Sequence, residues 1–308
     1  MRICSLLPSA TEIVYALGLE ENLVAVTREC DYPPEASRKP CVTRSDISPA
    51  LSSAEIDFRV RQQLDDVGTL YHLDVDMLES LRPDVILTQQ LCTVCAVSYE
   101  NVARIAQGLS SKPRVINLEP ISLEGIYQTI ETVGDLAGVQ DRARDLLRHM
   151  REKVERIRLL TSTCERKNVV CLEWLEPPFC AGHWIPELVE CAGGVDVFGG
   201  KHKPSHQVAW ERILSYTPEV LVVMCCGFTT ERTLQEISLL RKYDALRAVQ
   251  EGKVYVVDGS SYFSRPGPRI VESIEMLATI FHPQLFPIDY PEHVVHRVTF
   301  EEQILSSD

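Results

Sequence analysis

The sequence predicts an α/β protein with two Rossmann-like lobes, each built on a parallel sheet, joined by a single long rigid helix. Three observations support this prediction. The chain has 308 residues, more than one ordinary core accommodates. Short apolar runs alternate with amphipathic segments in both halves, as in βαβ units. A long helical pattern separates the halves, which gives boundaries of 1–121 for the N-terminal lobe, 122–161 for the interlobe helix and 162–308 for the C-terminal lobe and tail.

The N-terminal lobe begins with a βα rhythm that runs through RICSLL, SATEIVYALG, NLVAVTR, LDVDMLESLRPDVILT, SYENVARIAQGL and RVINL. Ser9 and Glu12 have the spacing of a capping box, which predicts a helix over 10–17. Asp74 is a good N-cap for a further helix, and Pro83 is expected to end that helix.

The segment from 122 to about 160 has apolar residues on one helical face, with Gly134 and Gly138 as the expected points of bending. Its composition lacks the Gly/Ser or Pro enrichment of a flexible linker, so we expect a strut. The βα rhythm then resumes with NVVCLEW, HWIPELVECAGG, SHQVAWERILSYTP, EVLVVMCCG, KVYVVD and PRIVESIEMLATIF. The tail after His282 is expected to be irregular.

One internal similarity relates the two halves. LESLRPDVILTQQLC at 78–92 resembles WERILSYTPEVLVVMCC at 210–226, and both read as a helix, a proline with an acid, an apolar strand and a cysteine-bearing loop. A proline and an acid before a strand also form a common helix-to-strand connection. Because the two stretches lie at corresponding points of both halves, they predict that the lobes are structural duplicates.

Composition excludes several classes of protein. A formal charge of −13 and a pI near 5.1 argue against a nucleic-acid partner, which requires basic patches. No apolar run approaches the ~18 residues of a membrane span, so the chain is not expected to be membrane-embedded. Its first residues, MRICSLLPSATEIV, do not read as a secretory signal, and the 11 cysteines fit a reducing compartment. We therefore expect a cytoplasmic location for the sequence as written, and a periplasmic or cell-surface location if its start is truncated.

The expected binding region follows from the sheet type, because ligands of open parallel sheets bind outside the carboxyl ends of the strands. The loops at those ends are PSA (8–10), RECDYPP (28–34), QQLCTVC (89–95), EWLEPPFCAGHW (173–184), CCGF (225–228) and GSSYFSRPGP (259–268). They are rich in aromatic side chains, which suit a large, flat organic ligand. Each aromatic residue taken alone fits an ordinary core position equally well.

The stretch RICSLLPSATEIVYALGLEENLVAVTRECDYPPEA resembles the opening of cobalamin-binding proteins, which belong to the helical-backbone (class III) substrate-binding family of ABC importers. That family also includes siderophore and haem binders. The similarity continues through LRPDVILT, the long helix and AWERILSYTPEVLVV, and covers roughly 2–285. The DYPP element points to the corrinoid branch.

The resemblance implies a monomeric binding protein that holds cobalamin or a related corrinoid between the lobes, with no catalytic cofactor. It implies a ring contact by Tyr32, an N-lobe wall from 90–94, and C-lobe contacts from Phe179, Trp184 and Trp210. The carboxyl-end loops add the candidate ligand-binding residues Arg28, Asp31, Gln89, Gln90, Cys92, Cys95, Glu173, Trp174, Phe263 and Arg265.

The resemblance also implies an ABC permease partner, which meets one acidic residue on each lobe. The matching candidates are Asp76 or Glu79 in the first lobe and Glu211 in the second. A solvated helix face is the alternative interpretation of these acids.

Cys92 and Cys95 allow several interpretations. A redox pair is weakened because the two cysteines precede the next helix by several residues instead of opening it. A zinc site requires four ligands and the chain has a single CxxC, so the others would come from residues such as Cys30, Cys180, His183, His206 or Cys225. Soft thiols that pack a pocket wall are favoured. A further hypothesis places Cys92, Cys95 or Cys30 at an axial position of cobalt.

The alternatives to a corrinoid binder are a siderophore or haem binder, and a cytoplasmic thiol-dependent metal-binding protein or enzyme that uses Cys92 and Cys95. The sequence contains no G-x-S-x-G, Walker A, H-E-x-x-H or G-x-G-x-x-G motif, so no enzymatic turnover is expected.

Overall fold

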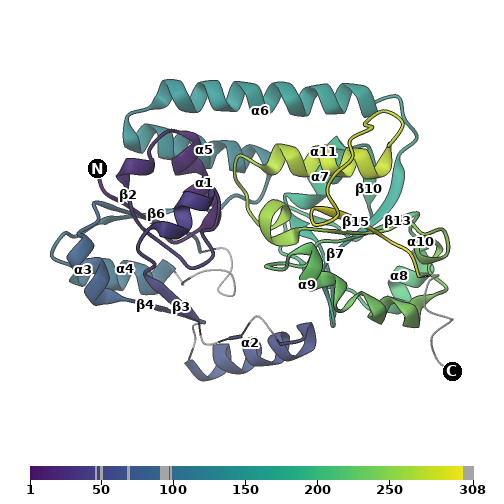
Figure 1. The fold of residues 1–308 in the computed structure, drawn as a ribbon, viewed down its shortest axis with the longest axis horizontal. Helices are drawn as coiled ribbons and strands as arrows, with labels where there is room; N and C mark the ends of the chain where they lie inside the picture. Colours follow the sequence, from purple (N-terminus) through teal and green to yellow (C-terminus); the bar gives the residue numbers. More distant parts are fainter. Residues whose placement is uncertain (46, 49–50, 68–69, 91–96, 98, 301–308) are drawn as a thin grey trace. The chain divides into compact units, whose positions relative to one another are not determined.

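A computed structural model describes residues 1–300, with the exception of 46, 49–50, 68–69, 91–96 and 98 (Figure 1). The chain divides into two α/β units. Unit 1 comprises Met1–Pro120 and Glu124–His149, and unit 2 comprises Ile121–Leu123 and the chain from Met150 onwards. The predicted α/β class is confirmed in each unit.

Unit 1 is built on a parallel sheet with the strand order β2-β1-β5-β6. Its strands are β1 (Ile3–Ser5), β2 (Leu23–Val26), β5 (Val85–Thr88) and β6 (Arg114–Asn117). Its helices are α1 (Pro8–Ala16), α3 (Val75–Leu81), α4 (Tyr99–Gly108) and α5 (Leu123–Ala137), with short 3-10 turns η1 (Glu20–Asn22) and η2 (Pro34–Arg38). The strands β1 and β5 are buried along their whole length, because helices cover both faces of a parallel sheet.

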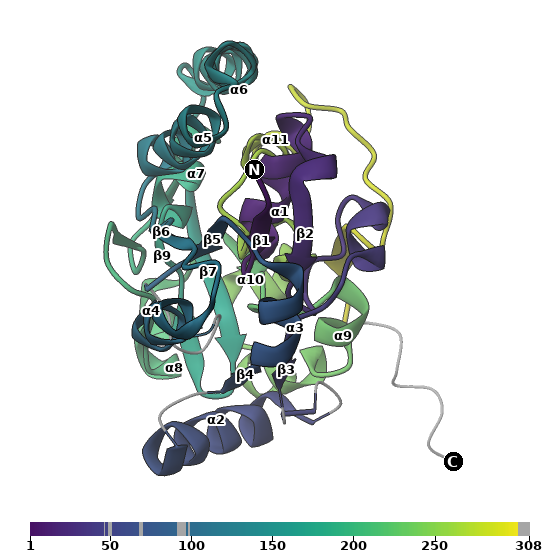
Figure 2. The same cartoon turned by 90° about the vertical axis from the view of Figure 1, so that its left-hand side faces the viewer.

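A hairpin with a helical insertion extends unit 1. Strands β3 (Thr43–Ser45) and β4 (Tyr71–Leu73) pair antiparallel, and α2 (Ser53–Val67) lies in the chain between them. Both ribbon views place α2 past the end of the sheet at which β1 and β2 finish (Figures 1 and 2). The sequence had not indicated this helix.

Unit 2 has a mixed sheet with the order β12-β8-β7-β13-β14-β15, and β10 also pairs with β7. Parallel pairing joins β10 (Gly194–Asp196), β7 (Lys167–Leu175), β13 (Val220–Val223) and β14 (Val254–Val257). Antiparallel pairing adds β8 (Pro178–Cys180), β12 (His206–Gln207) and β15 (Val295–Val298). Since β15 belongs to the tail, the expectation of an irregular tail is wrong at that strand.

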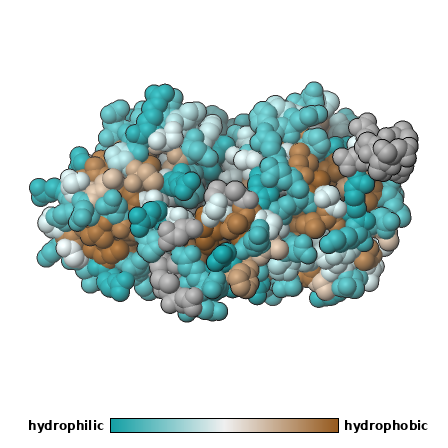
Figure 3. Space-filling view, turned by 60° about the horizontal axis from the view of Figure 1, so that its bottom comes forward, coloured by the Kyte–Doolittle hydropathy of each residue, from teal (hydrophilic) through white to brown (hydrophobic). Residues whose placement is uncertain are grey.

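The helices of unit 2 surround this sheet. They are α7 (Ile185–Cys191), α8 (Trp210–Tyr216), α9 (Thr230–Leu234), α10 (Arg247–Gln250) and α11 (Ile270–Phe281), with helical turns η3 (Ile237–Tyr243) and η4 (Gly259–Phe263). Within the described residues, no helix has both the length and the apolar character of a membrane span. The face in Figure 3 is mostly hydrophilic and shows separate hydrophobic patches.

The long helical segment consists of two helices, α5 and α6 (Gln140–Thr161). They separate at Gly138, whose φ of +70° is a backbone conformation that favours glycine. Gly134 allows the two helices to approach, because a Cβ there would lie 2.6 Å from the Cβ of Ala143. One boundary between the units falls inside α6, between His149 and Met150, so α6 is a continuous helix that leads from one unit to the other. Another falls at the start of α5, because Leu123 belongs to unit 2 and Glu124 to unit 1.

The internal similarity corresponds to a duplicated turn. Helix α3 ends at Arg82 in a left-handed conformation, and Pro83 and an acid then lead into β5. Helix α8 ends at Thr217 in the same conformation, and Pro218 and an acid lead into β13. The helix, proline with an acid and strand predicted for both stretches are therefore confirmed. The cysteine-bearing loop of the first stretch lies outside the described residues, and the duplication of the whole lobes stays a prediction.

Two predicted helix starts have different outcomes. Asp74 is the N-cap of α3 and its side chain accepts a hydrogen bond from the N–H of Met77 at 2.9 Å, as expected. The capping box of Ser9 and Glu12 is wrong, because α1 begins at Pro8 and has no side-chain cap. The fixed φ of proline suits the first helical position, which moves the start ahead of Ser9.

Candidate functional site

The carboxyl end of β7 carries the predicted residues Glu173 and Trp174. The pairing of β7 with β8 shifts register here, from Leu172 opposite Cys180 to Trp174 opposite Phe179, which leaves Glu173 at an irregularity of the bulge type. Such irregularities re-aim side chains and are frequent beside functional sites.

The loop that follows β13 runs beside this end of β7. The N–H of Cys226 donates to the carbonyl oxygen of Glu173 at 2.9 Å. Because β7 and β13 are parallel neighbours, the two segments lie at the edge of the sheet where ligands of this fold bind.

An aromatic pair lies at the same edge. The ring centroids of Trp174 and Phe228 are 4.9 Å apart, and the Arg232 guanidinium carbon lies 4.3 Å from the Phe228 centroid. Arg232 is in turn bonded to Glu236 at 2.5 Å. Trp174 is partly exposed, so this edge offers an apolar surface held in place by a cation–π contact and an ion pair.

Glu173 has two hydrogen-bond partners. The hydroxyl of Ser205 bonds its Oε2 atom, and the N–H of Gly182 bonds the same carboxyl group. Burial raises the pKa of Glu173 to about 8, and the neighbouring Cys226 and Asp196 act in the same direction. The carboxyl group is therefore mostly neutral at pH 7.

Asp196, at the end of β10, is a second acid with a raised pKa. Burial raises its pKa to about 7, although its Oδ1 atom accepts the N–H groups of Phe198 at 3.1 Å and Gly199 at 3.0 Å. Desolvation thus raises the pKa of two neighbouring acids, Glu173 and Asp196.

Ser205 ends a loop that packs closely on the short strand β9 (Gly182–His183), which pairs with β11 (Gly200–Lys201). A Cβ on Gly182 would lie 2.4 Å from the carbonyl oxygen of Lys203 and 2.5 Å from the nitrogen of Ser205. This contact fixes the place of Ser205 against Glu173. Sequence reasoning missed Ser205, because the pairing of β9 with β11 that brings it to Glu173 is not local.

Four of the predicted C-lobe residues have buried side chains, namely Trp184, Trp210, Phe263 and Arg265. The indole N–H of Trp184 donates to the carbonyl oxygen of Phe263 at 3.2 Å. Trp210 stacks on Tyr243 with centroids 4.2 Å apart and an interplanar angle of 19°. These contacts give the residues structural roles within unit 2, whereas Phe179, like Trp174, is partly exposed.

In unit 1, the loop after β2 carries the predicted residues Arg28, Asp31 and Tyr32, all of them exposed. The hydroxyl groups of Thr27 and Thr43 lie 2.7 Å apart, and the N–H of Arg28 donates to Thr43 at 3.1 Å, so β3 is attached to this loop. Tyr32 is 44% exposed.

The loop after β5 begins with Gln89 and Gln90. The N–H of Gln90 donates to the Asn117 side chain at 3.0 Å, and its side-chain amide donates to Glu100 at 2.8 Å. Cys92 and Cys95 lie outside the described residues, so every hypothesis about them stays a prediction.

The third proposed thiol ligand, Cys30, is 2% exposed and accepts a hydrogen bond from the Thr11 hydroxyl at 3.0 Å. Cys180 and Cys225, named above as partners for a zinc site, are also buried. Across the described part of the chain, no three His, Cys, Asp or Glu side chains are arranged to hold a metal ion.

The acids expected to meet a permease differ in their bonding. Glu79 accepts both the N–H of Ser110 at 2.9 Å and the Ser110 hydroxyl, and these bonds lower its pKa. Asp76 and Glu211 are exposed residues in the first turns of α3 and α8. Glu79 therefore has a structural partner in unit 1.

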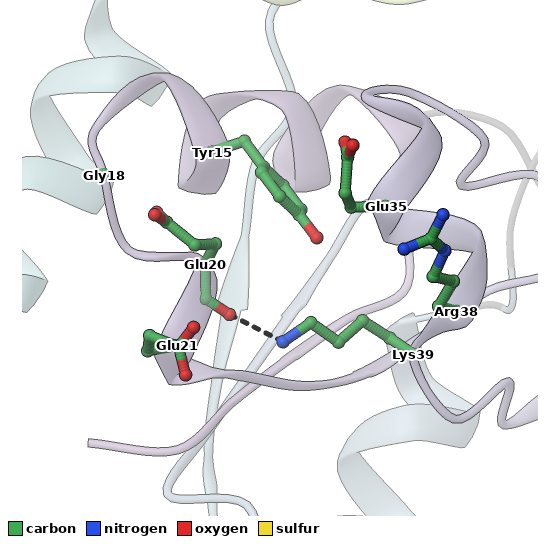
Figure 4. Close-up of a pocket in the computed structure, with 7 residues that line it drawn as sticks. All are labelled: Tyr15, Gly18, Glu20, Glu21, Glu35, Arg38 and Lys39. Atoms are coloured by element: carbon green, nitrogen blue, oxygen red, sulfur yellow. Dashed lines mark hydrogen bonds between the residues drawn. The ribbon is translucent and has the colours of Figure 1, made fainter.

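A separate pocket of about 550 Å³ lies between α1, η1 and η2 (Figure 4). Its lining residues are Tyr15, Gly18, Glu20, Glu21, Glu35, Arg38 and Lys39. The Lys39 ammonium donates to the carbonyl oxygen of Glu20 at 2.8 Å across its floor. None of the predicted site residues lines this pocket.

Comparison with known proteins finds similarity to several ligand-binding proteins. It is 25% identical to the vitamin B12-binding protein of Vibrio cholerae over 284 residues, which are 90% of this chain and 88% of that protein. The crystal structure of the periplasmic vitamin B12-binding protein BtuF of Vibrio cholerae is similar with a TM-score of 0.68 and 22% identity, over 91% of this chain and 95% of that one.

A periplasmic haem-binding protein from Pseudomonas aeruginosa has a TM-score of 0.69 at 19% identity, over 92% of each chain. Both solved structures are described as periplasmic, so the expected cytoplasmic location finds no support among them. A family model described as "Periplasmic binding protein" matches residues 3–260. The chain therefore belongs to the periplasmic binding protein family.

Proposed function

We propose that this protein binds cobalamin or a related corrinoid and presents it to an ABC permease. The observation that carries the proposal is the similarity to a protein named for vitamin B12, which spans 90% of this chain and 88% of that relative. A similarity of that extent covers both units and leaves no large part of the relative unmatched.

The carboxyl ends of the two sheets support this ligand class. Unit 1 offers the exposed ring of Tyr32, and unit 2 offers the partly exposed Trp174, fixed against Phe228. A corrin is large, flat and partly apolar, so aromatic surfaces of this kind suit it.

Delivery to a permease is the second part of the proposal. Asp76 on α3 and Glu211 on α8 are exposed and belong to the duplicated helix-turn-strand segments, one in each unit. Paired acidic residues in equivalent places suit a two-fold partner with basic side chains. The protein would then act outside the cytoplasm and perform no turnover.

A spectral titration of the purified protein with cyanocobalamin tests the ligand. We expect saturable, one-to-one binding at micromolar protein or below, with haem and a ferric hydroxamate siderophore as parallel titrations. Failure of cyanocobalamin to bind would refute the proposal. Stoichiometric zinc or iron in the purified protein, lost in Cys92→Ser, would instead favour the thiol-dependent metal protein.

Haem is the second candidate, because a haem-binding protein shows structural similarity of the same size. The haem-binding protein from Pseudomonas aeruginosa has a TM-score of 0.69, equal within 0.01 to the 0.68 of the vitamin B12-binding protein, so the fold alone does not separate the two ligands. Tight binding of haem with no response to cyanocobalamin would select it.

A further inference from the structure

We infer that Ser205 and Glu173 form one hydrogen-bonded pair that donates a hydrogen bond to a carboxamide oxygen of the bound ligand. The inference rests on the proposed function, because corrinoids carry carboxamide groups around their periphery. It assigns to the ligand a polar contact beside the apolar one made by Trp174.

The position of the pair supports this role. Glu173 lies at the register irregularity at the carboxyl end of β7, and its carbonyl oxygen is bonded to the loop after β13. The hydroxyl of Ser205 reaches its carboxyl group from the loop before β12. Both residues are partly exposed, so the pair is accessible at the edge that holds Trp174.

The number of hydrogen atoms decides what the pair can donate. An ionised carboxylate can only accept hydrogen bonds, so the Ser205 hydroxyl would use its single hydrogen to donate a hydrogen bond to Glu173. A neutral carboxyl group has a hydrogen of its own and can donate it to the oxygen of Ser205. The hydroxyl hydrogen of Ser205 is then free to point at a ligand oxygen.

The surroundings of Glu173 favour the neutral form. Titratable groups approach this region from four elements: Cys171 on β7, Cys180 on β8, Asp196 on β10 and Cys226 after β13. All become negative when they ionise, and burial raises the pKa of Glu173 to about 8. Arg212 acts on one of these groups and lowers the pKa of Cys180.

The packing of the loop makes the pair a fixed feature of unit 2. A Cβ on Gly182 would clash with the backbone of Lys203 and Ser205, so the loop lies directly on β9. The ion pair of Lys201 with Glu190 at 2.7 Å and the hydrogen bond between His202 and Glu187 at 2.5 Å tie the loop to α7. A donor held in this way loses little freedom when the ligand binds.

The consequence is a pH dependence of binding with a defined sign. Below about pH 7 Glu173 is neutral and Ser205 donates to the ligand. As the pH rises through about 8, Glu173 ionises and accepts a hydrogen bond from the Ser205 hydroxyl. That hydroxyl then no longer donates to the ligand, and the affinity for the ligand falls. The loss of one such bond corresponds to a decrease of about tenfold.

Titration with cyanocobalamin between pH 6 and 9.5 tests the inference, because the cyanide ligand does not titrate in this range. Wild-type affinity should fall above about pH 8. Glu173→Gln should keep the neutral-pH affinity and lose the pH dependence, because the amide donates to Ser205 and cannot ionise. Ser205→Ala should bind about tenfold more weakly at pH 6.5, again without pH dependence.

Ser215→Ala is the matched control, since its hydroxyl bonds the Glu211 carbonyl on the exposed side of α8. The affinity of this variant for cyanocobalamin should equal that of wild type at every pH. Wild-type binding that stays constant from pH 6 to 9.5, or an unchanged pH profile in Glu173→Gln, would overturn the inference and leave the proposed function standing. A complete lack of cyanocobalamin binding by wild type would overturn both, and thermal unfolding at each pH confirms that the variants are folded.

Discussion

The Asp84 carboxylate accepts the N–H of Arg2 at 2.7 Å, while the N–H of Asp84 donates to the carbonyl oxygen of Arg2 at 2.9 Å. The same two bonds join Glu219 to Asn168, at 3.0 and 2.9 Å. In both units the bonded pair directly precedes the first matched residues of two central parallel strands. The acid after each proline therefore aligns a strand with its neighbour.

Replacing either acid should destabilise its own unit. Asp84→Ala removes the acceptor for Arg2, and Glu219→Ala removes the acceptor for Asn168, each at an expected loss of about 1 kcal/mol of unfolding free energy. Hydrogen exchange read by mass spectrometry should show faster exchange in β1 and β5 for the first variant, and in β7 and β13 for the second. Asp84→Asn keeps an acceptor oxygen, so its unfolding free energy and hydrogen exchange should stay close to those of wild type. Equal acceleration in both units by either variant would contradict this assignment.

Stability should fall as the pH rises because of Glu173 and Asp196. Their pKa values are raised from 4.5 to about 8 and from 3.8 to about 7, so the folded state binds more protons than the unfolded chain between these values. Unfolding free energy then decreases with pH in this window, by up to ~1.4 kcal/mol per pH unit for each group, and levels off above about pH 8. Urea unfolding from pH 4.5 to 8.5 measures the slope.

Glu173→Gln removes one of the two groups that bind a proton in the folded state. The decrease of unfolding free energy with pH should therefore become shallower. Glu155→Gln, an exposed position on α6, serves as the control and should not alter it. An identical slope in wild type and Glu173→Gln would show that Glu173 ionises normally in the folded protein.

Gly182→Ala should destabilise unit 2 by about 1–3 kcal/mol, since its new methyl group would meet backbone atoms of Lys203 and Ser205. Gly108→Ala is the matched control because a Cβ there meets nothing within 4 Å. That variant should be neutral or stabilised by up to ~1 kcal/mol. Thermal unfolding monitored by circular dichroism compares the two variants. Similar unfolding midpoints would mean that the loop with Lys203 and Ser205 can move to accommodate the methyl group.

Tyr32→Ala and Trp174→Ala should each weaken cyanocobalamin binding by about tenfold or more, because each removes a ring that is available at the carboxyl end of a sheet. Leu159→Ala is the control, since Leu159 on α6 is 71% exposed and lies outside the predicted site. Isothermal titration calorimetry provides the affinities. Unchanged binding by both ring variants would place the ligand elsewhere.

Local chemistry explains what the sequence predicted well. Asp74 caps α3 through its own side chain, and the prolines at 83 and 218 end helices in both units, so these features need only a few neighbouring residues. The α/β rhythm and the duplicated turn follow from the same short-range signals. Even the error at α1 is local, because Pro8 outweighed the side chains of Ser9 and Glu12.

Features that depend on distant residues were not predictable in this way. Ser205 reaches Glu173 only because β9 and β11 pair, and neither strand exceeds two residues. Helix α2 was missed because Ile56, Val60 and Leu64 give a short apolar row within a charged segment, and all three stay half-buried. The burial of Trp184, Trp210 and Phe263 likewise depends on packing that composition does not show.

Helix α6 restricts how the two units can be recombined. The boundary between His149 and Met150 lies within 22 residues of continuous helix, whose buried side chains Leu147, Met150 and Val154 continue through it. A chimaera that exchanged one unit for that of a relative would have to join the chains inside this helix and keep its 3.6-residue phase. A single inserted residue would rotate everything after it by about 100°.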